Sequence, residues 1–363
     1  MHAGWQNGFL FTLAIVLTIL FVVLAKAMMK PLRTSVDLQA FRAENSLFES
    51  HPRLGFRPKP WAKVMDHVGS TGVVVRTDDR GARISVKGTA HSSPHRRILG
   101  VGCSQTWGFG VQNEDTFLAK VGSALDLAVD NFAVSGFGGT GAFLQVEEHL
   151  MLQPEVVIYG LWEDHINRNV TQCLEDASPV CVERPYLAVE EDQTFHMRMP
   201  TSNVENLDLL RRYYLETSEH TDQYRSFASD VRWVAYDLWA KGKILISKLS
   251  TRQMSHTQKI QGMQYILKNM NRAVDSYGGQ LVVVWIPLYF STEIHAPPDE
   301  FVVLSQQEGF LLVDMSGPFQ DMIEQGRPIA LPTDGHMNPD AHAEIAKAIT
   351  RVLEERLSLI AAS

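Results

Sequence analysis

The chain has 363 residues, of which 45% are hydrophobic and 20% are charged, and its formal net charge is −8. A chain of this length can bury one large core and still supply a membrane anchor. The acidic balance, with no basic stripe along the sequence, argues against nucleic acid as a partner.

An uncharged apolar run over residues 8–25 is the first feature along the chain. Eighteen helical residues rise about 27 Å, close to the hydrocarbon core of a bilayer, which is about 30 Å thick. Trp5 suits one membrane interface, and three basic residues suit the other: Lys26, Lys30 and Arg33. A cleaved signal peptide is the alternative, but no basic region precedes the run. We therefore predict a retained, single-pass anchor over residues 1–33.

Two features disagree about the side of the membrane on which the rest of the chain lies. The basic residues after the span favour the cytoplasm under the positive-inside rule. Cys173 and Cys181 flank a turn-rich stretch, which is typical of a disulfide-closed loop in an oxidising compartment, with two free thiols as the alternative. We predict an extracytoplasmic (periplasmic) domain on the inner membrane.

Residues 34–97 form a juxtamembrane segment before the main domain. Residues 51–60 contain too many prolines for a helix. Residues 73–77 are mostly β-branched and indicate a strand, which a turn at residues 78–81 follows. We expect either a small β-rich flap beside the site or a tether with one edge strand.

Ser104 lies in a glycine-rich turn, Gly100–Val111, between an apolar strand expected at residues 97–99 and a helix expected at residues 115–127. A serine in such a turn protrudes at the edge of a sheet, where neighbouring backbone N–H groups are free to donate. A nucleophile needs both features. Glycine-rich turns are common, so this stretch alone is a weak signal.

Apolar strands and helices alternate after the serine turn. Strands are expected at residues 130–134, 155–160, 280–287 and 310–314, and helices at residues 141–152, 257–277 and 299–308. This alternation predicts an α/β fold with a parallel sheet covered on both faces. The site of such a sheet lies outside the carboxyl ends of its strands. Ser104, Gly136 and Trp162 all closely follow strands, which indicates one shared site.

A polar segment, Trp162–Asn169, follows the third of these strands. Asp164 and Arg168 are four residues apart, as are His165 and Asn169, so a helical turn would pair them. We expect His165 or Arg168 to face the site with Asp164 as support, and the alternative is a solvated, ion-paired turn. One histidine with one aspartate is too few ligands for a metal site, so we predict no metal and no cofactor.

Residues 171–255 interrupt the alternation as an insertion with a charged helical region at residues 203–249. Three aromatic residues in it are three apart and share a helical face: Trp233, Tyr236 and Trp239. Such a face is typical of packing, and a carbohydrate platform is the alternative. We expect this insertion to determine the specificity for substrate or partner.

Asp334 and His336 precede a last helix expected at residues 340–357, with a tail at 358–363. In an extended segment, residues two apart point the same way, so this carboxylate can orient this imidazole. The imidazole can then take the proton of Ser104, which is the chemistry of a serine–histidine–acid triad. The alternative is that Asp334 caps the last helix and His336 lies in a solvated loop.

With these residues the chain resembles the SGNH (GDSL-like) hydrolases over residues 98–357. The resemblance rests on three blocks: Gly102-Cys103-Ser104, Asn131–Gly138 and Asp334-Gly335-His336. It implies a flavodoxin-like three-layer fold, an oxyanion-binding N–H from Gly136 with Gly138 beside it, and an extracytoplasmic domain.

Two departures from the family pattern bear on function. The acid–histidine spacing of two resembles membrane-associated, polysaccharide O-acetyltransferase-like branches of the family. The block that usually carries an oxyanion asparagine has Gly160-Leu161-Trp162-Glu163 instead.

Two classes of function follow from the sequence. The first is a membrane-anchored esterase, deacetylase or O-acyltransferase that acts on an acylated glycan or a small ester. The second is a catalytically silent subunit with this fold that binds or assembles with a membrane complex. The complete Ser/His/Asp set favours the first class, and the missing asparagine favours the second.

Overall fold

The computed structural model describes residues 47–68, 71–84, 96–174, 182–190, 192–200, 254–289, 293–332 and 334–362. The predicted anchor at residues 8–25 and the aromatic face at residues 233–239 lie outside these ranges. Across the described part of the chain, no helix combines the length and the apolar character needed to cross a membrane.

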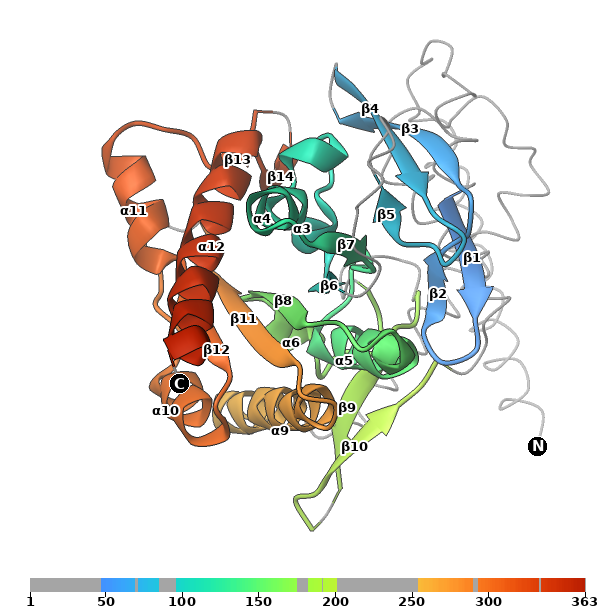
Figure 1. Cartoon of the computed structure of the whole chain (residues 1–363). Helices are drawn as coiled ribbons and strands as arrows, with labels where there is room; N and C mark the ends of the chain where they lie inside the picture. The colour runs from blue at the N-terminus through green and yellow to red at the C-terminus, as the bar shows by residue number, and fades with distance from the viewer. Residues whose placement is uncertain are drawn as a thin grey trace, which may run out of the picture.

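Five parallel strands form the centre of the molecule (Figure 1). They are β6 (Arg97–Gly102), β7 (Ala128–Asn131), β8 (Val156–Trp162), β11 (Gln280–Ile286) and β12 (Leu311–Asp314). Numbered along the chain, these five strands lie in the order 2-1-3-4-5 across the sheet, which is the flavodoxin-like order. The predicted parallel sheet is therefore confirmed, with small differences in the strand ends.

The sheet continues beyond β7 with three antiparallel strands from the N-terminal segment. These are β5 (Arg83–Ile84), β4 (Thr71–Thr77) and β3 (Lys63–Val68), which complete an eight-stranded sheet. A separate hairpin of β1 (Phe48–His51) and β2 (Gly55–Pro58) precedes them. The N-terminal segment is rich in strands, and β3–β5 belong to the central sheet and not to a separate flap or tether. Of these strands, β5 pairs with the edge of β7, β4 pairs with β5, and β3 pairs with β4, so they cover a strand edge that would otherwise lack partners.

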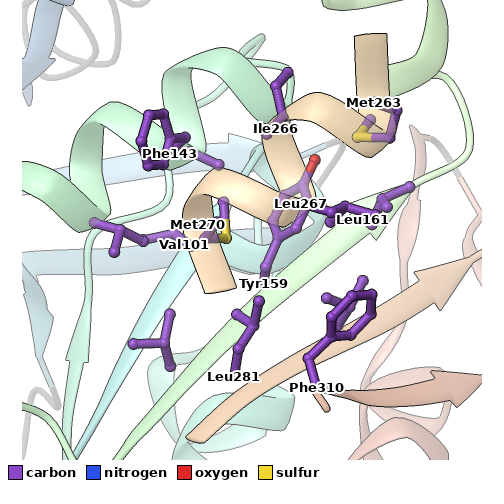
Figure 2. Packing of buried hydrophobic residues seen from close by; sticks show 14 of the residues in the cluster. Val101, Phe143, Tyr159, Leu161, Met263, Ile266, Leu267, Met270, Leu281 and Phe310 are labelled. Atoms are coloured by element: carbon purple, nitrogen blue, oxygen red, sulfur yellow. The ribbon is translucent and has the colours of Figure 1, made fainter. Parts of the chain in front are cut away.

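Helices cover both faces of the parallel strands. On one face lie α5 (Gly139–His149), α9 (His256–Asp275) and α10 (Asp299–Glu308), and on the other lie α4 (Phe117–Leu125), α11 (Ser316–Glu324) and α12 (Pro339–Ala362). Figure 2 shows the first core, in which Met263, Leu267 and Met270 of α9 pack on Tyr159 and Leu161 of β8. The fully buried Ile158 points to the other core, as expected for alternating residues of a strand covered on both sides.

Shorter elements complete the described structure. They are α3 (Ser104–Trp107), η1 (Asn113–Asp115), η2 (Leu150–Leu152), α6 (His165–Arg168), β9 (Tyr186–Val189), β10 (Phe195–Arg198), β13 (Ala330–Leu331) and β14 (Asp334–Met337). Two of them, α3 and β14, bring together residues that are 232 positions apart in the sequence.

Candidate active site

Ser104 is the first residue of α3 and follows directly from the carboxyl end of β6. Gly102 makes this sharp turn possible, because its φ is +150° and an added Cβ would lie 2.3 Å from the Thr106 hydroxyl. Ser104 is buried, with 6% of its surface exposed. Its backbone N–H, at the start of α3, has no acceptor among the described hydrogen bonds.

His336 lies on β14 and points at Ser104. The His336 Nε2 and Ser104 Oγ atoms are 2.8 Å apart, which is hydrogen-bonding distance. The predicted proximity of these two residues is thus confirmed. Asp334 belongs to the same strand, but its side chain lies outside what the structure describes, so its role remains a prediction.

The peptides on both sides of His336 are fixed by side chains that the sequence patterns did not indicate. The Met337 N–H donates to Gln105 Oε1 at 3.1 Å, and the Tyr289 hydroxyl donates to the Gly335 carbonyl at 2.7 Å. The Tyr289 hydroxyl also lies 3.1 Å from Gln105 Oε1. Because Gln105 follows Ser104 directly, this network links the strand of the histidine to the turn of the serine.

An aromatic ring covers the histidine. The centroids of the Phe109 and His336 rings are 4.6 Å apart, with an angle of 45° between the ring planes. Phe109 lies in the loop after α3, and its N–H donates to the Ser104 carbonyl at 3.1 Å. Hydrophobicity patterns gave no reason to select this residue.

The glycine block runs beside β6 after β7 has ended. Val134 N–H donates to the Gly102 carbonyl at 3.0 Å, so the chain reaches Gly136 close to the serine turn. Gly136 has φ +80°, and a Cβ there would lie 2.6 Å from Leu174 Cδ2. Arg184 Nη1 donates to the Gly136 carbonyl at 2.7 Å and to the Leu174 carbonyl at 3.2 Å. Arg184, in the first part of the insertion, therefore holds this turn in place.

Arg168 lies beside the glycine block. A Cβ on Gly138 would lie 3.0 Å from Arg168 Cβ. Arg168 Nε donates to Asp164 Oδ2 at 2.7 Å, so the predicted pair is confirmed. The guanidinium carbon stacks 4.5 Å from the centroid of the Trp162 ring. Two buried donors, Arg168 Nη1 and Trp162 Nε1, have no hydrogen-bond partner within the described structure.

The charge of Arg168 acts on the serine turn. Burial raises the pKa of the Cys103 thiol, and the positive charge of Arg168 partly opposes this rise. Cys103 is a free, buried neighbour of Ser104, and a raised pKa keeps its thiol protonated and unreactive.

His165 does not pair with Asn169 as the four-residue spacing predicted. His165 is fully buried, and its Nδ1 lies 2.8 Å from the Tyr159 hydroxyl. Asn169 Oδ1 instead accepts from the Thr140 N–H at 3.1 Å. Because α6 is a single turn of four residues, its side chains follow the neighbouring elements. Burial lowers the pKa of His165 well below its ordinary value, so the imidazole is neutral.

Cys173 is disulfide-bonded. Its backbone forms an isolated antiparallel bridge with Glu183, close to the Arg184 clamp. Cys181 lies outside the described residues. Those residues include no group of three side chains suited to hold a metal ion.

The site coincides with the reversal point of the sheet. Strands β7 and β8 both pair with β6, on opposite sides, so the order of strands along the chain reverses at β6. Ligands of open parallel sheets bind beyond the carboxyl ends of the strands at such a point. Ser104 follows β6, and Trp162 ends β8 with Asp164 and Arg168 after it, so the candidate catalytic groups lie at this edge of the sheet.

Comparisons with known proteins add likenesses of fold. No family model matches the chain, and no curated protein matches it. Solved structures do. One is a crystal structure of TesA, with 14% identity, a TM-score of 0.37, and 72% of this chain and 99% of that chain covered. A putative lipolytic protein of the G-D-S-L family from Desulfitobacterium hafniense has 11% identity and a TM-score of 0.36, with 70% and 98% covered.

A third similar structure is a family two carbohydrate esterase from Clostridium thermocellum in complex with cellohexaose. It has 11% identity and a TM-score of 0.35, with 77% of this chain and 68% of that chain covered.

Proposed function

We propose that this chain is a serine ester hydrolase or O-acyltransferase that acts on acyl esters. The observation that carries the proposal is the 2.8 Å contact between Ser104 Oγ and His336 Nε2 at the reversal point of the sheet. A nucleophile and a base at this distance are the core of acyl-transfer catalysis.

The chemistry follows from this contact. Ser104 Oγ attacks the acyl carbonyl while His336 Nε2 takes its proton, and Asp334 orients the imidazole. The acyl group is then bonded to Ser104, and His336 protonates the leaving alcohol. Attack by water or by a second hydroxyl, with His336 again as base, releases the acyl group and restores the enzyme. Water as acceptor gives an esterase or deacetylase, and a sugar hydroxyl gives an O-acyltransferase.

The negative oxygen that forms on the acyl carbonyl needs donors. The N–H groups of Ser104 and Gly136 are suitable, since neither has an acceptor among the described hydrogen bonds. Arg168 is our candidate for the missing asparagine, because its buried Nη1 has no partner within the described structure and its charge acts on Cys103, the neighbour of Ser104. Losing one such donor costs roughly 3–4 kcal/mol of transition-state stabilisation in enzymes that depend on it.

The place of action is also part of the proposal. The resemblance to O-acetyltransferase-like branches suggests an extracytoplasmic glycan as acyl donor or acceptor, with the chain held in the inner membrane by residues 8–25. The disulfide at Cys173 supports an oxidising compartment. Protease treatment of spheroplasts tests this placement, since an outward-facing domain is digested and a cytoplasmic one is protected.

A fluorophosphonate probe tests the enzymatic proposal directly. We expect the full chain to be labelled at Ser104, and Ser104→Ala to abolish labelling and reduce turnover of p-nitrophenyl acetate by at least about a thousandfold. Ser123→Ala is the matched control, because Ser123 is exposed on α4. Wild-type protein that is neither labelled nor active would favour the silent binding subunit instead.

A further inference from the structure

Arg83 is a buried cation that reaches the serine turn from the N-terminal segment. It lies on β5, where its backbone pairs with Asn131 of β7. Only 1% of its surface is exposed. An arginine this buried loses its hydration, which is strongly unfavourable unless hydrogen bonds replace the water.

The guanidinium of Arg83 holds the loop that follows α3. Nη1 donates to the carbonyls of Trp107 and Gly108, each at 2.6 Å, and Nη2 donates to the Val111 carbonyl at 2.5 Å. The planar fork of arginine is suited to bridging several acceptors at once. Its carbon also lies 5.6 Å from the centroid of the Trp107 ring.

Asn131 supports the same turn from the adjacent strand. Its Nδ2 lies 3.2 Å from the Thr106 carbonyl and 3.3 Å from the Trp107 carbonyl. The carbonyls at the end of a helix lack partners within the helix, and they carry a partial negative charge that a cation stabilises. Arg83 and Asn131 together satisfy this end of α3.

The held loop carries Phe109 between two of the residues that Arg83 binds, Gly108 and Val111. Phe109 in turn packs on His336, with ring centroids 4.6 Å apart. An aromatic ring within about 6 Å of a cation stabilises it. The imidazole becomes a cation when it takes the proton of Ser104, so this ring fixes the imidazole plane and packs against the charge that develops during the reaction.

We propose that Arg83 is a positioning residue of the active site, which holds the Gly108–Val111 loop so that Phe109 packs against the imidazole of His336. The inference rests on the proposed function, since it concerns how His336 serves Ser104. Through Arg83 on β5, the N-terminal segment then helps to position the base of the active site.

The test compares four variants of the full chain by fluorophosphonate labelling rate and by p-nitrophenyl acetate kinetics. Arg83→Lys keeps the charge but cannot bridge three carbonyls, and Phe109→Leu removes the ring. For both we expect kcat and the labelling rate to fall about tenfold or more, with KM changed less than twofold. Phe109→Tyr keeps the ring, and we expect it to retain most of the wild-type rate.

Arg80→Met is the matched control. Arg80 also lies in the N-terminal segment, but it bonds to Asp78 and Asp130 and does not contact the serine turn. We expect its labelling rate to stay within twofold of wild type. Because Phe109 is only partly buried, Phe109→Leu should fold even if Arg83→Lys does not.

The outcomes separate the two proposals. Wild-type protein without labelling or turnover would overturn the proposed function. Active wild-type protein, with Arg83→Lys and Phe109→Leu both labelled at the wild-type rate, would overturn the positioning role alone. A loss in Phe109→Tyr equal to that in Phe109→Leu would also overturn it, because the ring would then not be the relevant feature.

Discussion

Single hydrogen bonds around His336 decide how firmly the imidazole is held. The Tyr289 hydroxyl is the clearest case, because it reaches the carbonyl of Gly335, the residue before the histidine, at 2.7 Å. Gln105 Oε1 accepts from the N–H of Met337, the residue after His336. His336 is thus fixed through its own backbone as well as through its ring.

We predict that Tyr289→Phe destabilises the protein by about 1 kcal/mol, the usual net contribution of one hydrogen bond. We expect kcat to fall roughly three- to tenfold, since a looser β14 lets the imidazole leave its hydrogen-bonding position to Ser104. Urea unfolding and p-nitrophenyl acetate kinetics measure the two effects.

Tyr277→Phe is the control for this prediction. The Tyr277 hydroxyl is buried without a hydrogen-bond partner in the described structure, and burial raises its pKa to about 12. Removing it should leave stability and turnover unchanged or raise stability slightly. Equal kcat in Tyr289→Phe and wild type would contradict the role of Tyr289.

At the scale of elements, local signals located the helices and the parallel strands. Buried parallel strands are apolar runs, so β8 and β11 were visible in the sequence. The bounds expected for α10, residues 299–308, agree with the structure. The glycine-rich turn predicted Ser104 as the nucleophile, and the Asp334/His336 pair predicted its base. Both predictions rest on residue types and spacings that lie within a few positions of one another.

Features that depend on contacts between distant parts of the chain could not be predicted from the sequence. The short β5 joins the sheet through Arg83 and Asn131, which are 48 positions apart, and no local pattern encodes that pairing. Tyr289 lies in the loop after β11, where no periodicity marks it. The predicted pairing of His165 with Asn169 was wrong because the His165 ring bonds to Tyr159, on the neighbouring strand, and not to a residue of its own helical turn.

The N-terminal cap of α9 offers a prediction about an element away from the site. Ser255 Oγ accepts from the Gln258 N–H at 3.2 Å, and Gln258 Oε1 accepts from the Ser255 N–H at 2.9 Å. We predict that Ser255→Ala lowers the free energy of unfolding by about 1 kcal/mol. Turnover should not change, because Ser255 caps a helix that packs on the core and carries neither Ser104 nor His336. A change in kcat with unchanged stability would contradict this division.

For the whole molecule, buried histidines make stability depend on pH. Burial lowers the pKa of His342 to about 3, and its Nδ1 accepts from the Phe117 N–H at 3.2 Å. In the unfolded chain a histidine takes its proton near pH 6.5. Between these values the unfolded state binds more protons, so stability falls as the pH falls below about 6.5 and continues to fall toward pH 3.

We predict that wild-type protein loses about 2 kcal/mol more unfolding free energy than His342→Gln between pH 7 and pH 5. Burial lowers the pKa of His149 and His165 in the same direction, but both remain in the variant. The difference between the two proteins therefore isolates His342. Parallel stability curves from urea unfolding at the two pH values would contradict the prediction.

The separation of Ser104 and His336 by 232 positions has a consequence for how the protein is made. A ribosome adds Ser104 first, and it adds His336 only 232 residues later. Until β14 has been translated, the serine turn has no base to activate its hydroxyl. On the proposed mechanism, a nascent or truncated chain that lacks β14 is therefore inert toward esters.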